Sequence, residues 1–178
     1  ELNATVRRAV KDSDFSLVFW RGGAKIEDRT IVVYADAAFC NIMGTKSQCG
    51  HLGGFTNNLQ DVEKGEFSDV IPLWWHSGRV RRVVRSTHAA EGYGVSEGVE
   101  YGIYVKNVVS EINGTPGKQN PRKGYKSAPM KIQVYNDSSG LVGTVSRDVG
   151  IGSDKRFATV VAMLRETFND DGSGDAKL

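Results

Sequence analysis

The chain has 178 residues, of which 39% are hydrophobic, and it carries a formal net charge of +2. This length favours one domain with an ordinary core, and so small a net charge does not by itself indicate a nucleic-acid partner. No apolar stretch approaches the roughly 20 residues of a helical membrane span, so we expect none.

Residues 1–29 are polar except for an apolar patch at residues 15–20, and we predict a connecting arm that leads into the first strand. Because the sequence begins at Glu1 rather than at a methionine, we interpret it as a piece of a longer polypeptide. Residues 30–35 are almost continuously apolar, which is typical of a central strand covered on both faces. Asp36 follows this run directly, so we expect it at the strand end.

A second, weaker strand is predicted over residues 47–56, followed by a polar loop at residues 57–68 and a third strand at residues 69–75. Glycines in the second strand let the backbone bend or let another element approach closely. These glycines are Gly50, Gly53 and Gly54. Cys40 and Cys49 lack the spacing of a zinc site or a redox pair, so we expect free thiols.

A basic cluster follows the third strand, and its members are Arg79, Arg81, Arg82 and Arg85. These side chains have two interpretations. They either contact the phosphates of a nucleic acid, which positions a duplex without reading its sequence, or they belong to a solvated turn.

Residues 87–112 predict a long helix in which two sets of residues recur every four positions, so that each set shares a face. One set is Glu91, Val95, Val99 and Ile103, and the other is Ala90, Gly94, Gly98 and Gly102. Each internal glycine costs about 1 kcal/mol relative to alanine, so we expect another element to press closely on the small set. Glu91 is either a site carboxylate that points with the core or an acid that complements the helix dipole.

A loop rich in glycine, proline and lysine precedes a predicted strand at residues 131–135. Asp137 comes next, and it has two interpretations: a site carboxylate, or the N-cap of a helix that begins near Ser138 and Ser139. A last amphipathic helix is predicted over residues 153–168, with Ser153 or Asp154 as its cap.

Three acidic residues therefore stand beside predicted element ends, namely Asp36, Glu91 and Asp137. If the strands that precede Asp36 and Asp137 are parallel neighbours, both carboxylates emerge at the same edge of the sheet, where open α/β sheets place their sites. Converging carboxylates are the ligands that Mg²⁺ prefers, and Mn²⁺ is a possible substitute.

Four short segments resemble successive blocks of the ribonuclease H domain of copia-type retrotransposon polyproteins. These segments are residues 34–39 (YADAAF), 85–91 (RSTHAAE), 134–139 (VYNDSS) and 155–166. The similarity runs from about residue 30 to residue 168, and the order and spacing of the blocks both agree with that family.

The resemblance implies a ribonuclease H-like mixed α/β fold with strand order close to 3-2-1-4, in which the first three strands are antiparallel and the fourth is parallel to the first. It implies that residues 30–168 hydrolyse the RNA strand of an RNA–DNA hybrid with two Mg²⁺ ions. Asp36 would bridge the metals, and Glu91 and Asp137 would hold one each. Residues 1–29 would connect to a preceding reverse transcriptase, and the protein would act in the cytoplasm or the nucleus.

The sequence departs from the family at its C-terminal end. The family's fourth carboxylate follows a fifth strand, whereas residues 169–178 are predicted to form a flexible acidic, glycine-containing tail. Asp148, Asp154 and Asp175 do not match the missing motif. The missing elements should leave an apolar face or sheet edge exposed, which a protein partner could cover. The alternative function is therefore a module without nuclease activity that acts as a structural or binding subunit.

Overall fold

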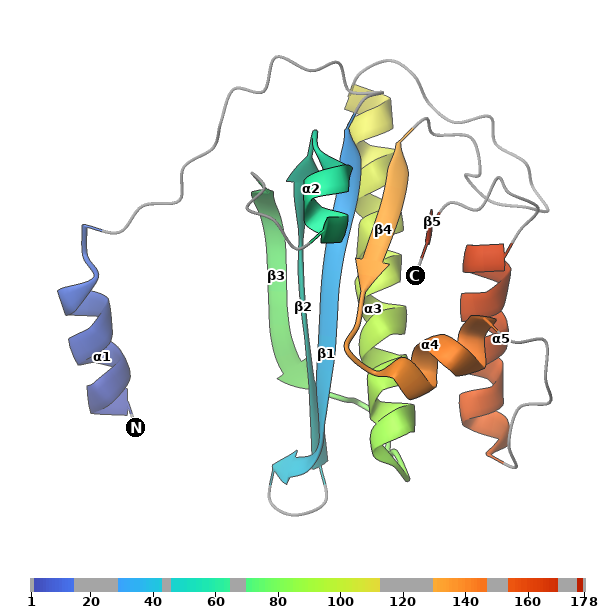
Figure 1. The fold of residues 1–178 in the computed structure, drawn as a ribbon. Helices are drawn as coiled ribbons and strands as arrows, with labels where there is room; N and C mark the ends of the chain where they lie inside the picture. Colours follow the sequence, from blue (N-terminus) through green and yellow to red (C-terminus); the bar gives the residue numbers. More distant parts are fainter. Residues whose placement is uncertain are drawn as a thin grey trace.

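The computed structural model describes residues 2–14, 29–42, 46–64, 70–112, 130–146, 154–169 and 176–177. In chain order the elements are α1 (Leu2–Lys11), β1 (Thr30–Ile42), β2 (Lys46–Thr56), α2 (Leu59–Lys64), β3 (Ile71–Arg79), α3 (Thr87–Ile112), β4 (Lys131–Tyr135), α4 (Ser139–Ser146), α5 (Lys155–Asn169) and β5 (Ala176–Lys177). Figure 1 shows them arranged around one sheet, with α1 drawn apart from it.

The sheet has the strand order β3-β2-β1-β4-β5. The first three strands are antiparallel to their neighbours, and β4 runs parallel to β1. This arrangement confirms the predicted mixed α/β class and the order 3-2-1-4. The short strand β5 was not expected: Ala176 and Lys177 pair in parallel with Ile132 and Gln133 at the β4 edge, and the residues 170–175 before them lie outside the described part.

Strand β1 is longer than its apolar run suggests, which corrects the expected place of Asp36. The parallel ladder between β1 and β4 ends at the pair Tyr34 and Tyr135. Beyond it β1 continues to Ile42, because β2 supplies hydrogen-bonding partners for this half of the strand. Asp36 therefore lies inside β1, just beyond the point where β4 ends.

Two other expectations from sequence need correction. The predicted polar loop at residues 57–68 contains the short helix α2, at whose start the Asn58 side chain hydrogen-bonds to Asp61. Strand β3 extends to Arg79, so this arginine ends a strand instead of belonging to the following loop. Polar composition alone misled in both places, because short helices and exposed edge strands need no apolar run.

Helix α3 has the bounds predicted for it, and its small residues lie against the sheet as expected. A Cβ at Gly98 would come within 3.0 Å of the Val33 Cγ1 atom, and one at Gly94 within 3.2 Å of the Asp36 carbonyl oxygen. The core between α3 and the sheet contains fully buried Ile31, Val33 and Val95. This close contact fixes the distance between α3 and β1.

The opposite face of the sheet is less covered. Figure 1 places α2 in front of β1 and β2, whereas α3 lies behind them and α4 and α5 continue on that side.

Cys40 and Cys49 are free thiols, as predicted. None of the helices in the described ranges combines the length and apolarity of a membrane span.

The two glycines Gly54 and Gly50 provide a test of the packing in β2. A Cβ at Gly54 would collide with the backbone carbonyl of Ile71, whereas one at Gly50 would lie 3.4 Å from the His76 carbonyl oxygen. We expect Gly54→Ala to lower the free energy of unfolding by about 1–3 kcal/mol, because backbone must shift. The matched change Gly50→Ala should cost less than about 0.5 kcal/mol. Urea denaturation measures both, and equal costs would contradict this packing.

Candidate metal centre

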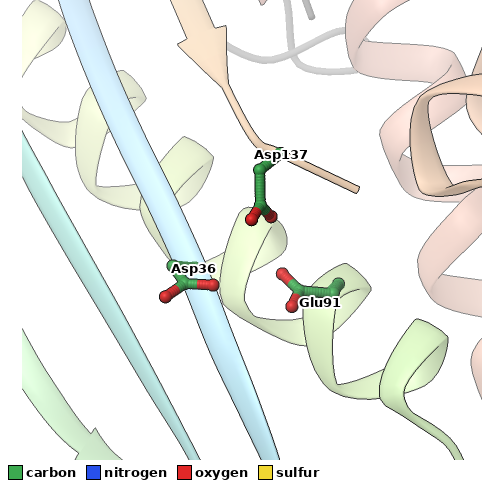
Figure 2. Close-up of side chains that lie close together, drawn as sticks. All are labelled: Asp36, Glu91 and Asp137. Atoms are coloured by element: carbon green, nitrogen blue, oxygen red, sulfur yellow. The ribbon is translucent and has the colours of Figure 1, made fainter. Parts of the chain in front are cut away.

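Three carboxylates meet at one end of the β1–β4 ladder. Asp36 comes from β1, Glu91 from α3 and Asp137 from the turn after β4, and one ligand oxygen of each lies within 4.8 Å of the others. Figure 2 shows the three side chains pointing toward a common space. Asp36 and Asp137 are exposed and Glu91 is buried, so the cluster has an accessible side and an anchored side.

The fold explains why these residues meet. The parallel register that pairs Tyr34 with Tyr135 brings Asp36 and Asp137 to neighbouring positions at the same sheet edge. Gly94 lets α3 approach the backbone of Asp36, and Glu91 lies almost one turn before Gly94. One parallel strand pairing and one close helix contact therefore bring together three acidic residues that lie far apart in the sequence.

The structure decides between the interpretations of Glu91 and Asp137. Helix α4 is capped by Ser138, whose Oγ accepts a hydrogen bond from the Leu141 amide at 3.3 Å, so Asp137 is not the N-cap. Helix α3 begins at Thr87 and has no acid in its first turn. Glu91 lies beyond that turn and is only 5% exposed, which is too buried for a simple complement to the helix dipole.

Burial raises the pKa of the Glu91 carboxyl, because a charge is poorly solvated there. The neighbouring carboxylates of Asp36 and Asp137 raise the pKa further by repulsion. Hydrogen bonds from the Asn136 side chain and the Ala37 backbone lower it, but less than burial and repulsion together raise it. A cation placed among the three carboxylates would relieve this repulsion.

Asn136 is a positioning residue to which the sequence analysis gave no role. Its Nδ2 group donates hydrogen bonds of 2.9 Å to the Ala35 carbonyl and of 2.9 Å to Glu91 Oε2. Its Oδ1 atom accepts a bond from the Ser138 amide at 3.0 Å. One side chain thus connects β1, α3 and the start of α4. The only feature of the sequence that could have indicated this role is the position of Asn136 directly before Asp137.

The donor set fits a hard divalent cation. All three groups offer carboxylate oxygens, which Mg²⁺ and Mn²⁺ accept, and the two exposed aspartates leave room for water. Of the possible fourth carboxylates, Asp154 caps α5, with its Oδ1 accepting bonds from the Arg156 and Phe157 amides at 3.0 and 3.3 Å. Asp148 and Asp175 lie outside the described residues.

The cluster opens into a groove of about 900 Å³ along the sheet. Its lining includes Asp36 and Asp137, with Tyr34, Leu52 and Trp75 on one side of them and Ala38 and Gln48 on the other. A substrate that reaches the carboxylates therefore has an open approach.

The predicted basic cluster is divided by the fold. Arg79 ends β3, whereas Arg81, Arg82 and Arg85 are exposed on the loop before α3. Buried Val80 and Val84 anchor this loop.

Arg85 lines a pocket of about 200 Å³ together with Asp154, Lys155 and Arg156 at the start of α5. The sequence analysis gave Lys155 and Arg156 no binding role. The available signal was a pair of cations in the first turn of a helix, where the dipole disfavours them.

Three solved structures are similar to this chain. The N-terminal RNase H domain of a Mycobacterium tuberculosis protein, fused to maltose-binding protein, is 12% identical with a TM-score of 0.44, over 83% of this chain and 78% of that one. A ribonuclease H1 isolated from compost by metagenomics is 15% identical with a TM-score of 0.42, over 83% of this chain and 81% of that one. Comparison with protein-family models finds no match, and comparison with curated proteins finds none either. Any chemistry must therefore be argued from this chain's own side chains.

Glu91 should make the stability of the metal-free protein depend on pH. Because the pKa of Glu91 is raised in the folded state, the folded protein binds this proton more tightly than the unfolded chain does. The stability that Glu91 contributes is therefore fully present below the unfolded pKa of 4.5 and is lost as pH rises through the folded pKa. The free energy of unfolding, measured by urea denaturation in EDTA at a series of pH values from 4.5 upward, should fall with pH in the wild type. It should fall less steeply in Glu91→Gln. The same pH dependence in both proteins would show that folding does not raise the pKa of Glu91.

Proposed function

We propose that residues 30–168 form a ribonuclease H-like nuclease that hydrolyses the RNA strand of RNA–DNA hybrids. The convergence of Asp36, Glu91 and Asp137 within 4.8 Å carries this proposal. Residues from three separated segments meet there, and the position of each one in the sequence matches the motif order of the resembling family.

Two Mg²⁺ ions at this centre would activate water and stabilise the leaving oxygen of an in-line displacement. Asp36, exposed in the middle strand, is the residue suited to contact both ions, and Glu91 and Asp137 would hold one each. Asn136 orients Glu91 by donating a hydrogen bond to its Oε2 atom, and the Ala37 backbone also donates to this carboxylate. The groove beside the aspartates gives the scissile strand access.

The loop before α3 would hold the backbone of the hybrid. Arg81, Arg82 and Arg85 are exposed on it, and Arg85 shares its pocket with Lys155 and Arg156. Phosphate contacts of this kind position a duplex without reading bases, which suits an enzyme that accepts hybrids of any sequence. Arg79, at the end of β3, would extend the basic surface.

We further propose that the domain belongs to a copia-type retrotransposon polyprotein and follows its reverse transcriptase, to which residues 1–29 would connect. The four sequence blocks between residues 34 and 166 support this assignment. Such a protein would act in the cytoplasm or the nucleus.

One observation favours a second candidate, a module without nuclease activity that serves as a structural or binding subunit. The described residues contribute three carboxylates to the centre, and Asp154 is occupied in capping α5. A protein whose centre binds metal weakly would keep this fold but would not hydrolyse the hybrid.

Substitution of Asp36 separates the two candidates. Asp36→Asn should abolish cleavage of a labelled RNA–DNA hybrid and the binding of Mg²⁺ in calorimetry. It should slightly stabilise the metal-free protein, because it removes repulsion among clustered acids. The control Glu166→Gln changes an exposed carboxylate on α5 and should leave all three measurements unchanged.

Wild-type cleavage that Asp36→Asn abolishes supports the nuclease. Mg²⁺ binding without cleavage favours the second candidate. Unchanged Mg²⁺ affinity in Asp36→Asn would refute the metal centre itself.

The salt dependence of hybrid binding tests the loop before α3. Arg85→Ser should weaken binding and reduce the slope of log affinity against log salt by about one unit, because one phosphate contact is lost. Val83 lies two residues away and is 80% exposed, so Val83→Ser is a matched control without a charge change. Fluorescence anisotropy over a salt series measures both, and equal slopes would exclude Arg85 as a phosphate contact.

A further inference from the structure

His51 is a buried histidine that the proposed nuclease chemistry does not use. It lies on β2, on the side that packs against α3, and is only 3% exposed. A Cβ at Gly98 of α3 would lie 3.3 Å from the His51 Cβ atom and 3.5 Å from the Cβ atom of Ala35, so α3 and β1 enclose the histidine without contributing a charge at this point. Buried polar groups are normally hydrogen-bonded, and among the described residues only one ring nitrogen of His51 has a partner.

The one hydrogen bond fixes where His51 carries its proton. The Trp74 indole Nε1–H group donates to His51 Nδ1 at 3.1 Å. An indole nitrogen is a donor only, so Nδ1 is the unprotonated nitrogen and the neutral ring carries its proton on Nε2. The Nε2 atom is buried, and no acceptor among the described residues reaches it. A second proton can therefore enter only at Nδ1, where it breaks the bond from Trp74.

The groups around His51 do not compensate for a positive charge. The His76 ring of β3 stacks on the His51 ring with centroids 5.2 Å apart, and the Tyr101 ring of α3 lies at 4.9 Å. Glu97 of α3 also faces this region, but its Oε2 atom already accepts a hydrogen bond of 3.4 Å from the Cys49 thiol. Burial lowers the pKa of His51, His76 lowers it further, and Glu97 opposes both without offsetting them. The fold therefore favours the neutral ring.

Trp74 is the residue that this hydrogen bond holds in place. Its indole ring lies over Gly53, where a Cβ would collide with the ring, and it packs against the core beneath the sheet. Strand β3 is at the edge of the sheet and pairs on one side only, with β2. The register of that pairing shifts between Gly53 and Gly54, so the ladder is irregular beside Trp74. The Trp74 side chain is therefore an important attachment of β3.

Trp75 connects this attachment to the groove beside the carboxylates. Successive residues of a strand point to opposite faces, so Trp75 faces the groove whereas Trp74 faces α3. Trp75 is 69% exposed and pairs with Leu52 of β2. A shift of the β3 backbone at Trp74 therefore also moves one wall of the groove.

We propose that His51 is a pH-dependent switch that holds or releases β3. Neutral His51 keeps the Trp74 indole over Gly53, whereas protonated His51 releases it and loosens the groove wall that Trp75 forms. Because the pKa of His51 is lowered by folding, the unfolded chain binds this proton more tightly than the folded protein does. The stability that the switch contributes is fully present above the unfolded pKa of 6.5 and is lost as pH falls through the folded pKa.

Nuclear magnetic resonance of the full chain in EDTA tests the switch. Above pH 6.5 the His51 ring should carry its proton on Nε2, and the Trp74 indole proton should have the chemical shift of a hydrogen-bonded group. As pH falls, the Trp74 indole signal should move to the shift of a solvent-exposed indole, with the same midpoint as the His51 ring. The signals of Val33 and Val99 in the core should not change over this range.

Three matched substitutions sharpen the test. His51→Asn places an amide oxygen near the position of Nδ1 and cannot titrate, so it should keep Trp74 hydrogen-bonded at every pH at which the protein is folded. His88→Asn removes a histidine at the start of α3 and should leave the Trp74 transition unchanged. His76→Asn removes a group that repels protonated His51, so the midpoint should move to higher pH.

A Trp74 transition that follows His51 and disappears in His51→Asn supports the proposal. The proposal is overturned if the transition persists in that variant, if His51 titrates without a change at Trp74, or if His51 does not titrate while the core signals remain native. Should His51→Asn fail to fold, the exposed His76 still provides the decision, because a midpoint that does not rise in His76→Asn contradicts the switch. No metal binding or cleavage is measured, so a failed nuclease assignment leaves these outcomes unchanged.

Discussion

The close contact between α3 and β1 is the constraint on which the site depends. Gly94 and Gly98 bring the helix so near that a Cβ would touch Val33 or the Asp36 carbonyl. Glycine inside a helix is costly, and that cost is offset here because the contact buries apolar side chains. The same contact carries Glu91 to the sheet edge. A helix held farther away by larger residues would leave the two aspartates without their third partner.

The centre created by this contact is electrostatically unfavourable without a cation. Glu91 is buried beside two further carboxylates, and both burial and repulsion raise its pKa. Asn136 partly compensates by donating to Glu91, but it also bonds to β1 and to the turn before α4. The geometry is therefore held by the fold itself, and it provides the preorganisation that the proposed metal-dependent reaction would require.

The two faces of the sheet differ in a way that bears on function. The face toward α3 is closed by a packed core, whereas the other presents Tyr34, Leu52 and Trp75 beside the carboxylates. Access to the centre and exposure of apolar surface thus occur on the same face of the sheet, over which α2 lies among the described residues. Whatever covers that face also controls the approach to Asp36 and Asp137.

Local pattern by itself determined the long helix and pointed to the three candidate carboxylates, since periodicity and short motifs are properties of neighbouring residues. The order of the strands was expected from the resemblance to a known family and not from local pattern. Only the tertiary structure decided that β1 continues past Asp36, because β2 and not β4 supplies the hydrogen-bonding partners there. It also decided that Ser138, not Asp137, caps α4, and that Asn136 bonds to Glu91. These outcomes depend on contacts between segments far apart in the chain, which no local pattern encodes.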